Sequence, residues 1–167
     1  MPSIPEAENE VQRIREAAFR LLAVRARSAR ELKTRLTQKK FSAKHIERVI
    51  ADLQEKGYQS DEEFARLFAH EKWTSSGWGP GRTRQALAQK GITQQVSEQI
   101  IEEVYGEADL IEGLLPLARK RWRTTEGRDD ATRKRRLIGF LQRRGYNWDT
   151  IQRVLKEVSQ GSPEQSS

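Results

Sequence analysis

Residues 87–104 read LAQKGITQQVSEQIIEEV, and the same pattern occurs at residues 36–53, LTQKKFSAKHIERVIADL, and at residues 141–158, LQRRGYNWDTIQRVLKEV. Each copy starts with a leucine, has a basic residue three positions later, and has a large apolar residue followed by a small polar one at its sixth and seventh places. Four positions lie four, seven, eight and eleven residues beyond that small polar residue, and eleven of these twelve positions are aliphatic. Because this spacing places the side chains on one face of a helix, the sequence predicts a tandem helical repeat.

The length of the repeat sets the number of helices in each copy. The three leucines lie 51 and 54 residues apart, which is longer than most two-helix repeats and leaves room for three helices. We therefore predict an all-α fold, an elongated array of three tandem three-helix repeats that resemble helix-turn-helix units. The expected repeats span residues 11–57, 60–105 and 108–159, with flexible ends at residues 1–10 and 160–167. No segment alternates with a period of two, so no sheet is expected.

Composition agrees with a repeat fold. Of the 167 residues, 35% are hydrophobic and 33% are charged, so any core is thin, and stacked repeats need less core per residue than a globule does. The absence of cysteine excludes disulfides and thiolate metal sites. No apolar run approaches the roughly 20 residues that cross a bilayer, and the amino terminus lacks a signal-peptide pattern. We expect a cytoplasmic protein without a membrane partner.

Residues that start and stop helices support these boundaries. Ser28 followed by Glu31 is a capping box, in which the two side chains satisfy free backbone donors at the start of a helix. Gly57 is placed to close a helix in the left-handed conformation. Pro116 lies inside the helix expected at residues 110–122, which it should kink or split because proline cannot donate the helical hydrogen bond.

Positive charge is concentrated in the third repeat. Residues 119–144 contain eleven basic and three acidic residues, a net charge of +8, whereas the whole chain is +7, so the remainder is −1. Such a cluster attracts polyanions and acidic protein surfaces. If it contacts nucleic-acid phosphates, each neutralised phosphate should add roughly 0.9 to the slope of log affinity against log salt on a duplex, and about 0.7 on a single strand.

Two interpretations of the basic residues remain open. Lys39, Lys90 and Arg144 each fall in the last turn of a predicted helix, where a cation offsets the helix dipole without any partner. Residues 133–136 are four consecutive cations, which span all sides of a helix and therefore favour partner binding. The candidate partner-binding or nucleic-acid-binding residues are Arg82, Arg84, Lys90, Arg119, Lys120, Arg121, Arg123, Arg133, Lys134, Arg135, Arg136, Arg143, Arg144 and Trp148.

Large apolar residues divide into core and interface candidates. Phe41, Ile92 and Tyr146 hold matching places in the three copies and are expected to fill the gap between successive helices. Trp148 has no aromatic counterpart, and it begins the last helix, where the reading helix of a three-helix DNA-binding module meets its partner. Packing and partner contact both remain possible for Trp148 and for Trp78, which lies in a glycine-rich loop.

The sequence gives little support for catalysis. His45 and His70 lie on different predicted helices without cysteine companions, which argues against a zinc site. The carboxylates at residues 61–63 stand at a predicted helix amino terminus, where acidic side chains are expected for dipole reasons. Glycines at residues 77–81 weakly resemble a phosphate loop but lack its preceding strand and its Lys-Ser/Thr pair. We expect no enzymatic activity, no cofactor and no metal.

Taken in order, the residues resemble the RecX family of regulatory proteins over about residues 15–158. The most specific features are a Lys-Gly-Tyr turn, an acidic residue, Phe-Ala, Gly-x-Gly-Pro and Lys-Gly-Ile, in that order. The first repeat contributes Phe19, Ser28, Glu31, Leu32, Leu36, Val49, Leu53, Gly57, Tyr58, Phe64, Ala65 and Phe68. The second and third contribute Gly79, Pro80, Arg82, Leu87, Lys90, Gly91, Ile92, Phe140, Leu141, Arg144, Gly145, Tyr146, Ile151 and Val154.

The resemblance implies three tandem three-helix repeats and a protein that modulates the RecA recombinase. It implies binding along the groove of the active RecA filament on single-stranded DNA, inhibition of the ATPase, strand-exchange and co-protease functions, and filament disassembly. The expected partners are the RecA filament and DNA, single-stranded or duplex, bound weakly and without base preference by a monomer. Two positions depart from the pattern: Pro116 interrupts a helix, and Lys40 stands where the other two repeats have glycine.

Two other functions fit the same residues. A stand-alone DNA-binding protein of the helix-turn-helix type would bind duplex DNA tightly and in a sequence-dependent manner without a partner, whereas a filament modulator should bind naked DNA weakly. A purely structural adaptor made of helical repeats would do neither.

Overall fold

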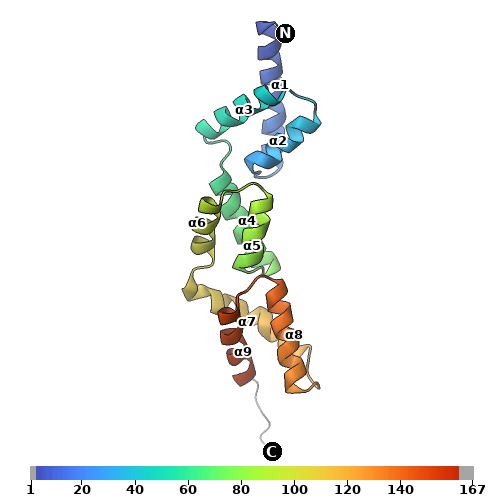
Figure 1. The fold of residues 1–167 in the computed structure, drawn as a ribbon, viewed down its shortest axis with the longest axis vertical. Helices are drawn as coiled ribbons and strands as arrows, with labels where there is room; N and C mark the ends of the chain where they lie inside the picture. Colours follow the sequence, from blue (N-terminus) through green and yellow to red (C-terminus); the bar gives the residue numbers. More distant parts are fainter. Residues whose placement is uncertain (1–2, 162–167) are drawn as a thin grey trace, which may run out of the picture. The chain divides into compact units, whose positions relative to one another are not determined.

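The computed structural model describes residues 3–161, apart from the side chains of residues 107–109. This part of the chain forms nine helices and contains no strand, which confirms the all-α prediction (Figure 1). The helices are α1 (Ile4–Val24), α2 (Ala29–Gln38), α3 (Ala43–Glu55), α4 (Asp61–Ser76), α5 (Pro80–Gln89), α6 (Gln94–Val104), α7 (Glu107–Arg123), α8 (Asp130–Arg143) and α9 (Trp148–Gln160). None of the described helices is long and apolar enough to cross a membrane.

The chain folds as two compact units. The first comprises the chain up to Phe68 together with Leu87–Ser97, and the second comprises Ala69–Ala86 together with the chain from Glu98 onward. The middle repeat expected from the sequence is therefore divided, because α4, α5 and α6 each contribute residues to both units.

Unit 1 is built around a three-helix bundle, in which α1, α2 and α3 each pack on the other two. Its core consists of Val11, Ile14, Ala17, Ala18, Leu32, Leu36, Ile46, Val49, Ile50 and Leu53, with Phe41 packed against it. Fully burying one such leucine or isoleucine side chain contributes about 1.5–3 kcal/mol, so this compact set accounts for the fold of a highly charged segment.

Unit 2 has a bundle of the same kind, in which α7, α8 and α9 pack on one another. Its core consists of Leu114, Ala118, Trp122, Leu137, Leu141, Tyr146, Ile151, Val154 and Val158. Tyr105 adds a buried polar contact, because its hydroxyl lies 2.7 Å from that of Thr83. Burial raises the pKa of Tyr105 above its usual value, although the hydrogen bond with Thr83 opposes this change.

Equivalent positions of the three sequence copies have equivalent surroundings. The three repeat leucines, Leu36, Leu87 and Leu141, are all completely buried. In each copy the residue after the basic one has a left-handed backbone, with φ of 64° at Lys40, 81° at Gly91 and 90° at Gly145. The repeat predicted from the sequence is therefore a structural repeat as well.

The amino-terminal end differs from the prediction. Residues 4–10, expected to be flexible, form the first turns of α1. The helix begins early because the backbone amide of Ser3 donates to Glu6 at 2.8 Å, and because Glu10 accepts a hydrogen bond from the amide of Ser42 at 3.2 Å. At the other end, Gln160 closes α9, and the remainder of the expected flexible segment, beyond residue 161, lies outside the described residues.

Other helix boundaries follow the expected signals. Ser28 and Glu31 form the predicted capping box of α2, and Gly57 has the predicted left-handed conformation, with φ of 78°. Pro116 does not split its helix, since α7 continues through it from residue 107 to residue 123. Packing of α7 against α8 and α9 holds the helix together across the missing backbone donor.

Candidate functional site

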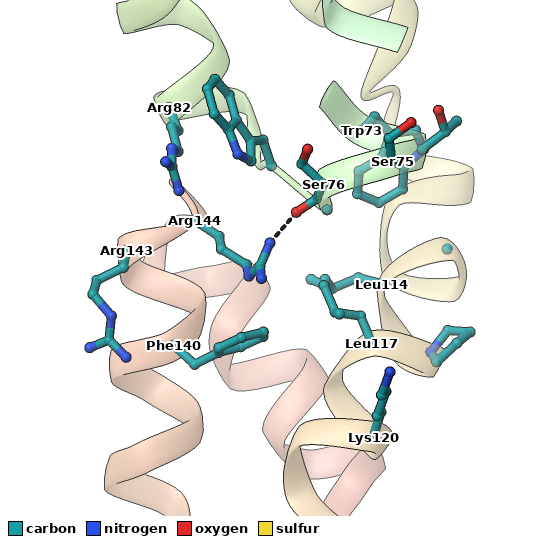
Figure 2. Close-up of a pocket in the computed structure, with 15 residues that line it drawn as sticks. Trp73, Ser75, Ser76, Arg82, Leu114, Leu117, Lys120, Phe140, Arg143 and Arg144 are labelled. Atoms are coloured by element: carbon teal, nitrogen blue, oxygen red, sulfur yellow. Dashed lines mark hydrogen bonds between the residues drawn. The ribbon is translucent and has the colours of Figure 1, made fainter. Parts of the chain in front are cut away.

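A cleft of unit 2 has a volume of about 860 Å³. It lies among the end of α4, the loop that follows, the first turn of α5, the middle of α7 and the end of α8 (Figure 2). The residues that line it are Trp73, Thr74, Ser75, Ser76, Gly77, Trp78, Arg82, Gly113, Leu114, Pro116, Leu117, Lys120, Phe140, Arg143 and Arg144. We call this site the basic cleft.

Close backbone contacts fix one wall of the basic cleft. The amide of Gly79 donates to the carbonyl of Arg144 at 2.6 Å, and the amide of Gly81 donates to the carbonyl of Gly145 at 2.9 Å. A Cβ atom at either Gly79 or Gly81 would lie 2.9 Å from the Gly145 carbonyl oxygen. Glycine is therefore required at both positions so that the α4–α5 loop can approach the turn after α8.

Two side chains of that turn reach back to the same loop. The guanidinium of Arg144 donates to the carbonyl oxygen of Ser76, as Figure 2 shows, and the hydroxyl of Tyr146 donates to the carbonyl of Gly77 at 2.9 Å. Burial raises the pKa of Tyr146 well above its usual value, so its phenol stays protonated and remains a donor. The loop is held by four hydrogen bonds and is preorganised.

The basic cleft carries four cations and no described acidic residue. Arg82 stacks on Trp78, with its Cζ atom 4.1 Å from the ring centroid, and Arg144 stacks on Phe140 at 4.5 Å. A guanidinium stacked on a ring keeps its edge available for bidentate hydrogen bonds to a carboxylate or phosphate. Arg82, Lys120 and Arg143 are exposed and pair with no carboxylate whose position the structure describes. This arrangement suits an anionic partner.

Among the candidate residues from the sequence, the structure brings Arg82, Lys120, Arg143 and Arg144 together in the basic cleft. Arg121 lies beside the same site, with its Cζ atom 5.3 Å from the Phe140 ring centroid. Arg119 and Arg123 are exposed elsewhere on α7.

The four consecutive cations of α8 have different environments. Arg133 lies 4.0 Å from the Trp122 ring centroid and donates to the hydroxyl of Thr125, so it packs on its own unit. Lys134 forms an ion pair with Asp130 at 2.6 Å. Arg135 and Arg136 are exposed.

The remaining three candidates also lie away from the cleft. Lys90 belongs to unit 1, where its ammonium pairs with Glu31 at 2.7 Å. Arg84 donates two hydrogen bonds to Glu98. Trp148 is 53% exposed on the first turn of α9.

The structure also explains residues that were considered for other chemistry. The amides of Gly79 and Gly81 donate to carbonyl oxygens, so the glycine-rich segment does not form a phosphate loop. Asp61 accepts a hydrogen bond from the amide of Ala29 at 2.8 Å and thereby caps α2. His45 bonds to Glu10, and no group of metal-ligating side chains occurs among the described residues.

Two aromatic contributions were incompletely predicted. The sequence leaves packing and partner contact both possible for Trp78 and gives Phe140 only as part of the resemblance to RecX; in the structure each ring stacks with an arginine of the basic cleft. The spacing of Phe140 could have indicated this contact. Phe140 lies in α8 four residues before Arg144, and residues four apart are neighbours on a helix surface.

Comparison with known proteins identifies the fold and the family. Models of the first, second and third three-helix domains of RecX match residues 15–53, 60–104 and 107–155. The regulatory protein RecX of Amycolatopsis mediterranei (strain U-32) is 34% identical over 150 residues, which cover 90% of this chain and 85% of that protein. The regulatory protein RecX of Chlorobaculum tepidum is 34% identical over 141 residues, which cover 84% and 85%.

A solved structure has the same fold. The crystal structure of RecX from Lactobacillus salivarius superimposes with a TM-score of 0.84 over 92% of this chain and 99% of that chain, at 19% identity, and so supports the fold. With three consecutive domain models matched in order and relatives matched over most of their length, the chain belongs to the RecX family of regulatory proteins.

Proposed function

We propose that this protein is a negative regulator of the RecA recombinase, which binds the RecA filament on single-stranded DNA. In this proposal it inhibits the ATPase, strand-exchange and co-protease functions of the filament. It acts as a cytoplasmic monomer, without a cofactor and without catalytic activity of its own. Membership of a family of regulatory proteins supports this assignment, as does the resemblance of the three repeats to RecX.

The observation that carries the proposal is the basic cleft of unit 2. Its four cations lack a described acidic neighbour, and hydrogen bonds to the α4–α5 loop hold its shape. A nucleoprotein filament offers both acidic side chains and phosphates, and a preformed cationic cleft raises the rate of encounter with such a surface. Because the loop is already ordered, little conformational entropy is lost when the partner binds.

The test is RecA-driven ATP hydrolysis on single-stranded DNA. Adding the purified protein at amounts up to that of RecA should slow hydrolysis in a dose-dependent manner, and co-sedimentation should place it with the filament. Unchanged hydrolysis at every ratio would reject the proposal. A heat-denatured sample at equal concentration controls for nonspecific effects of added protein.

A stand-alone DNA-binding protein is the second candidate function. It is favoured by Trp148, which is 53% exposed at the first residue of α9, the place of a reading helix in a three-helix module. Binding to random duplex DNA in the absence of RecA separates the two. Enrichment of a particular sequence from a random duplex library would support the second candidate, whereas weak binding without enrichment supports the filament regulator.

A further inference from the structure

A second cationic site lies in unit 1, at the junction between α1 and α2. A cavity of about 300 Å³ opens there. It is lined by Arg25, Arg27, Arg30, Glu31, Thr34, Arg35, Gln89 and Lys90. These comprise five cations and one carboxylate, and none of the described lining residues is apolar.

The single carboxylate is fully engaged by two of the five cations. Glu31 accepts hydrogen bonds from both terminal nitrogens of Arg25, at 3.1 and 3.2 Å, and from Lys90 at 2.7 Å. Arg27, Arg30 and Arg35 form no ion pair with a carboxylate that the structure describes. The cavity therefore has three uncompensated guanidinium groups.

One of these groups is hydrogen-bonded to the backbone, and a second lies against a glycine. The Nε atom of Arg27 donates to the carbonyl of Leu21 at 3.2 Å, which leaves its terminal nitrogens for other acceptors. Arg30 lies against Gly91, where a Cβ atom would be 2.8 Å from both the Cβ and the Nε of Arg30. The missing side chain at Gly91 thus makes room for Arg30 beside the cavity.

The spacing along α2 completes the site. Thr34 follows Arg30 by four residues and Arg35 follows Glu31 by four residues, so these side chains lie one helical turn apart. Threonine hydroxyls and arginine guanidinium groups are among the donors that contact nucleic-acid phosphates.

The electrostatics of the cavity favour a bound anion. Burial lowers the pKa of Arg27, and the positive charges of Arg25 and Arg35 lower it further, while Glu31 opposes them. Like charges held this close repel one another, and an anion in the cavity would relieve the repulsion. Arginines also occur in protein interfaces, but there they accompany apolar or aromatic anchors, and the described lining has none.

We propose that Arg27, Arg30 and Arg35, with Thr34, form a phosphate-binding site for the backbone of a nucleic-acid strand. The site lies entirely in unit 1, is separate from the basic cleft of unit 2, and does not require the recombinase as partner. It offers no surface for stacking bases, because no described aromatic side chain lines the cavity. Phosphate contacts at this site raise the affinity for the strand and make that affinity depend on salt concentration.

The first test measures binding of the full chain to a fluorescein-labelled dT30 oligonucleotide by fluorescence anisotropy, without RecA. The test variant carries Arg27→Gln, Arg30→Gln and Arg35→Gln. The control carries Arg20→Gln, Lys44→Gln and Arg48→Gln, which removes the same charge from exposed positions of the same unit. The test variant should bind at least tenfold more weakly, with a salt slope flatter by about 2, as expected for three lost phosphate contacts on a single strand.

Equal affinities and slopes for the two variants would overturn the proposal. Labelled poly-L-glutamate is the second probe, and a loss confined to that probe would also overturn it, in favour of an acidic protein surface. Nuclear magnetic resonance of the arginine Nε–H groups tests the wild-type chain directly. Adding dT30 should shift the signals of Arg27, Arg30 and Arg35 and not that of Arg20; the reverse would contradict the site. Because RecA is absent throughout, the result is independent of the proposed function.

Discussion

A methyl group on Gly145 would lie 2.2 Å from the backbone nitrogen of Arg82. The turn after α8 thus packs directly on the first turn of α5, backbone against backbone. The same relationship occurs in unit 1, where the carbonyl of Lys90 accepts a hydrogen bond from the hydroxyl of Ser28 at 2.7 Å, next to Gly91. In both cases the turn after the second helix of one repeat packs on the start of the second helix of the preceding repeat.

The first prediction concerns this contact. Gly145→Ala should lower the free energy of unfolding by about 2–5 kcal/mol, since a left-handed alanine is strained and its methyl group overlaps Arg82. Gly57→Ala is the matched control, because Gly57 is also left-handed but has no atom within 4 Å of the added Cβ, and should cost only about 1–2 kcal/mol. Urea unfolding measures both. Equal losses of stability in the two variants would show that the overlap with Arg82 does not contribute to the free energy of unfolding.

Lys40 occupies the equivalent turn of the first repeat with φ of 64°. Replacing it by glycine removes the strain of a left-handed side chain, about 1–2 kcal/mol, at an entropic cost of about 0.5–1 kcal/mol. Lys40→Gly should therefore raise the free energy of unfolding by roughly 0–1.5 kcal/mol. Lys39→Gly, at a residue with φ of −80°, should lower it. A loss of stability in Lys40→Gly would contradict this account of the turn.

Glu31 predicts a dependence of stability on pH. Burial alone would raise the pKa of its carboxyl, but hydrogen bonds from Arg25, Lys90 and the Ser28 amide outweigh burial and lower the pKa from 4.5 to about 2. A group with a lowered pKa in the folded state stabilises the fold above about pH 4.5 and loses this contribution as the pH falls towards 2.

Glu31→Gln should accordingly lower the free energy of unfolding at pH 7 by about 1–2 kcal/mol, a value reduced for solvent screening. The difference from wild type should shrink at pH 3. Glu47→Gln is the control, because Glu47 makes only an exposed ion pair with Lys33. A difference between wild type and Glu31→Gln that is constant from pH 7 to pH 3 would rule out this role of the charge.

The basic cleft provides the fourth prediction. Replacing Arg82, Lys120 and Arg143 by glutamine should weaken binding to the RecA filament at least tenfold and flatten its salt dependence. The melting temperature should fall only slightly, because all three side chains are exposed and only Arg82 loses a described ring contact, with Trp78. The control replaces Arg84, Lys134 and Arg153, which already pair with Glu98, Asp130 and Asp149. Co-sedimentation with the filament measures the binding of both variants. Equal losses of binding would show that the filament contact lies outside the basic cleft.

The periodic features of the fold could be predicted from the sequence because they depend on local spacing. Leu36, Leu87 and Leu141 were aligned by their distances to a capping residue and an apolar stripe, and all three are completely buried. The start of α1 was missed although its signal is present, since Ser3 and Glu6 have the spacing of a capping box. The stabilising contact of Glu10 with residues 42 and 45 depends on packing and has no local signature.

The candidate site was only partly predictable. Charge density in residues 119–144 indicated Lys120, Arg143 and Arg144, but not that Arg144 would bond to the carbonyl of Ser76, 68 residues away. The cationic cavity of unit 1 was not predicted either, because Arg27, Arg30 and Arg35 are interspersed with Glu31 and give no charge run. Both sites arise from elements that are distant in sequence, and a linear count of charges does not reveal which cations remain uncompensated.

The start of α8 differs from the starts of α2 and α5 in one respect. Asp129 accepts hydrogen bonds from both the amide and the hydroxyl of Thr132, at 2.9 and 2.6 Å, so this helix end is closed by its own acidic side chain. Ser28 and Gly79, by contrast, each offer a donor to a later carbonyl. The first turn of α8 is therefore satisfied from within its own segment, and this helix start needs no contact from another element to be ordered.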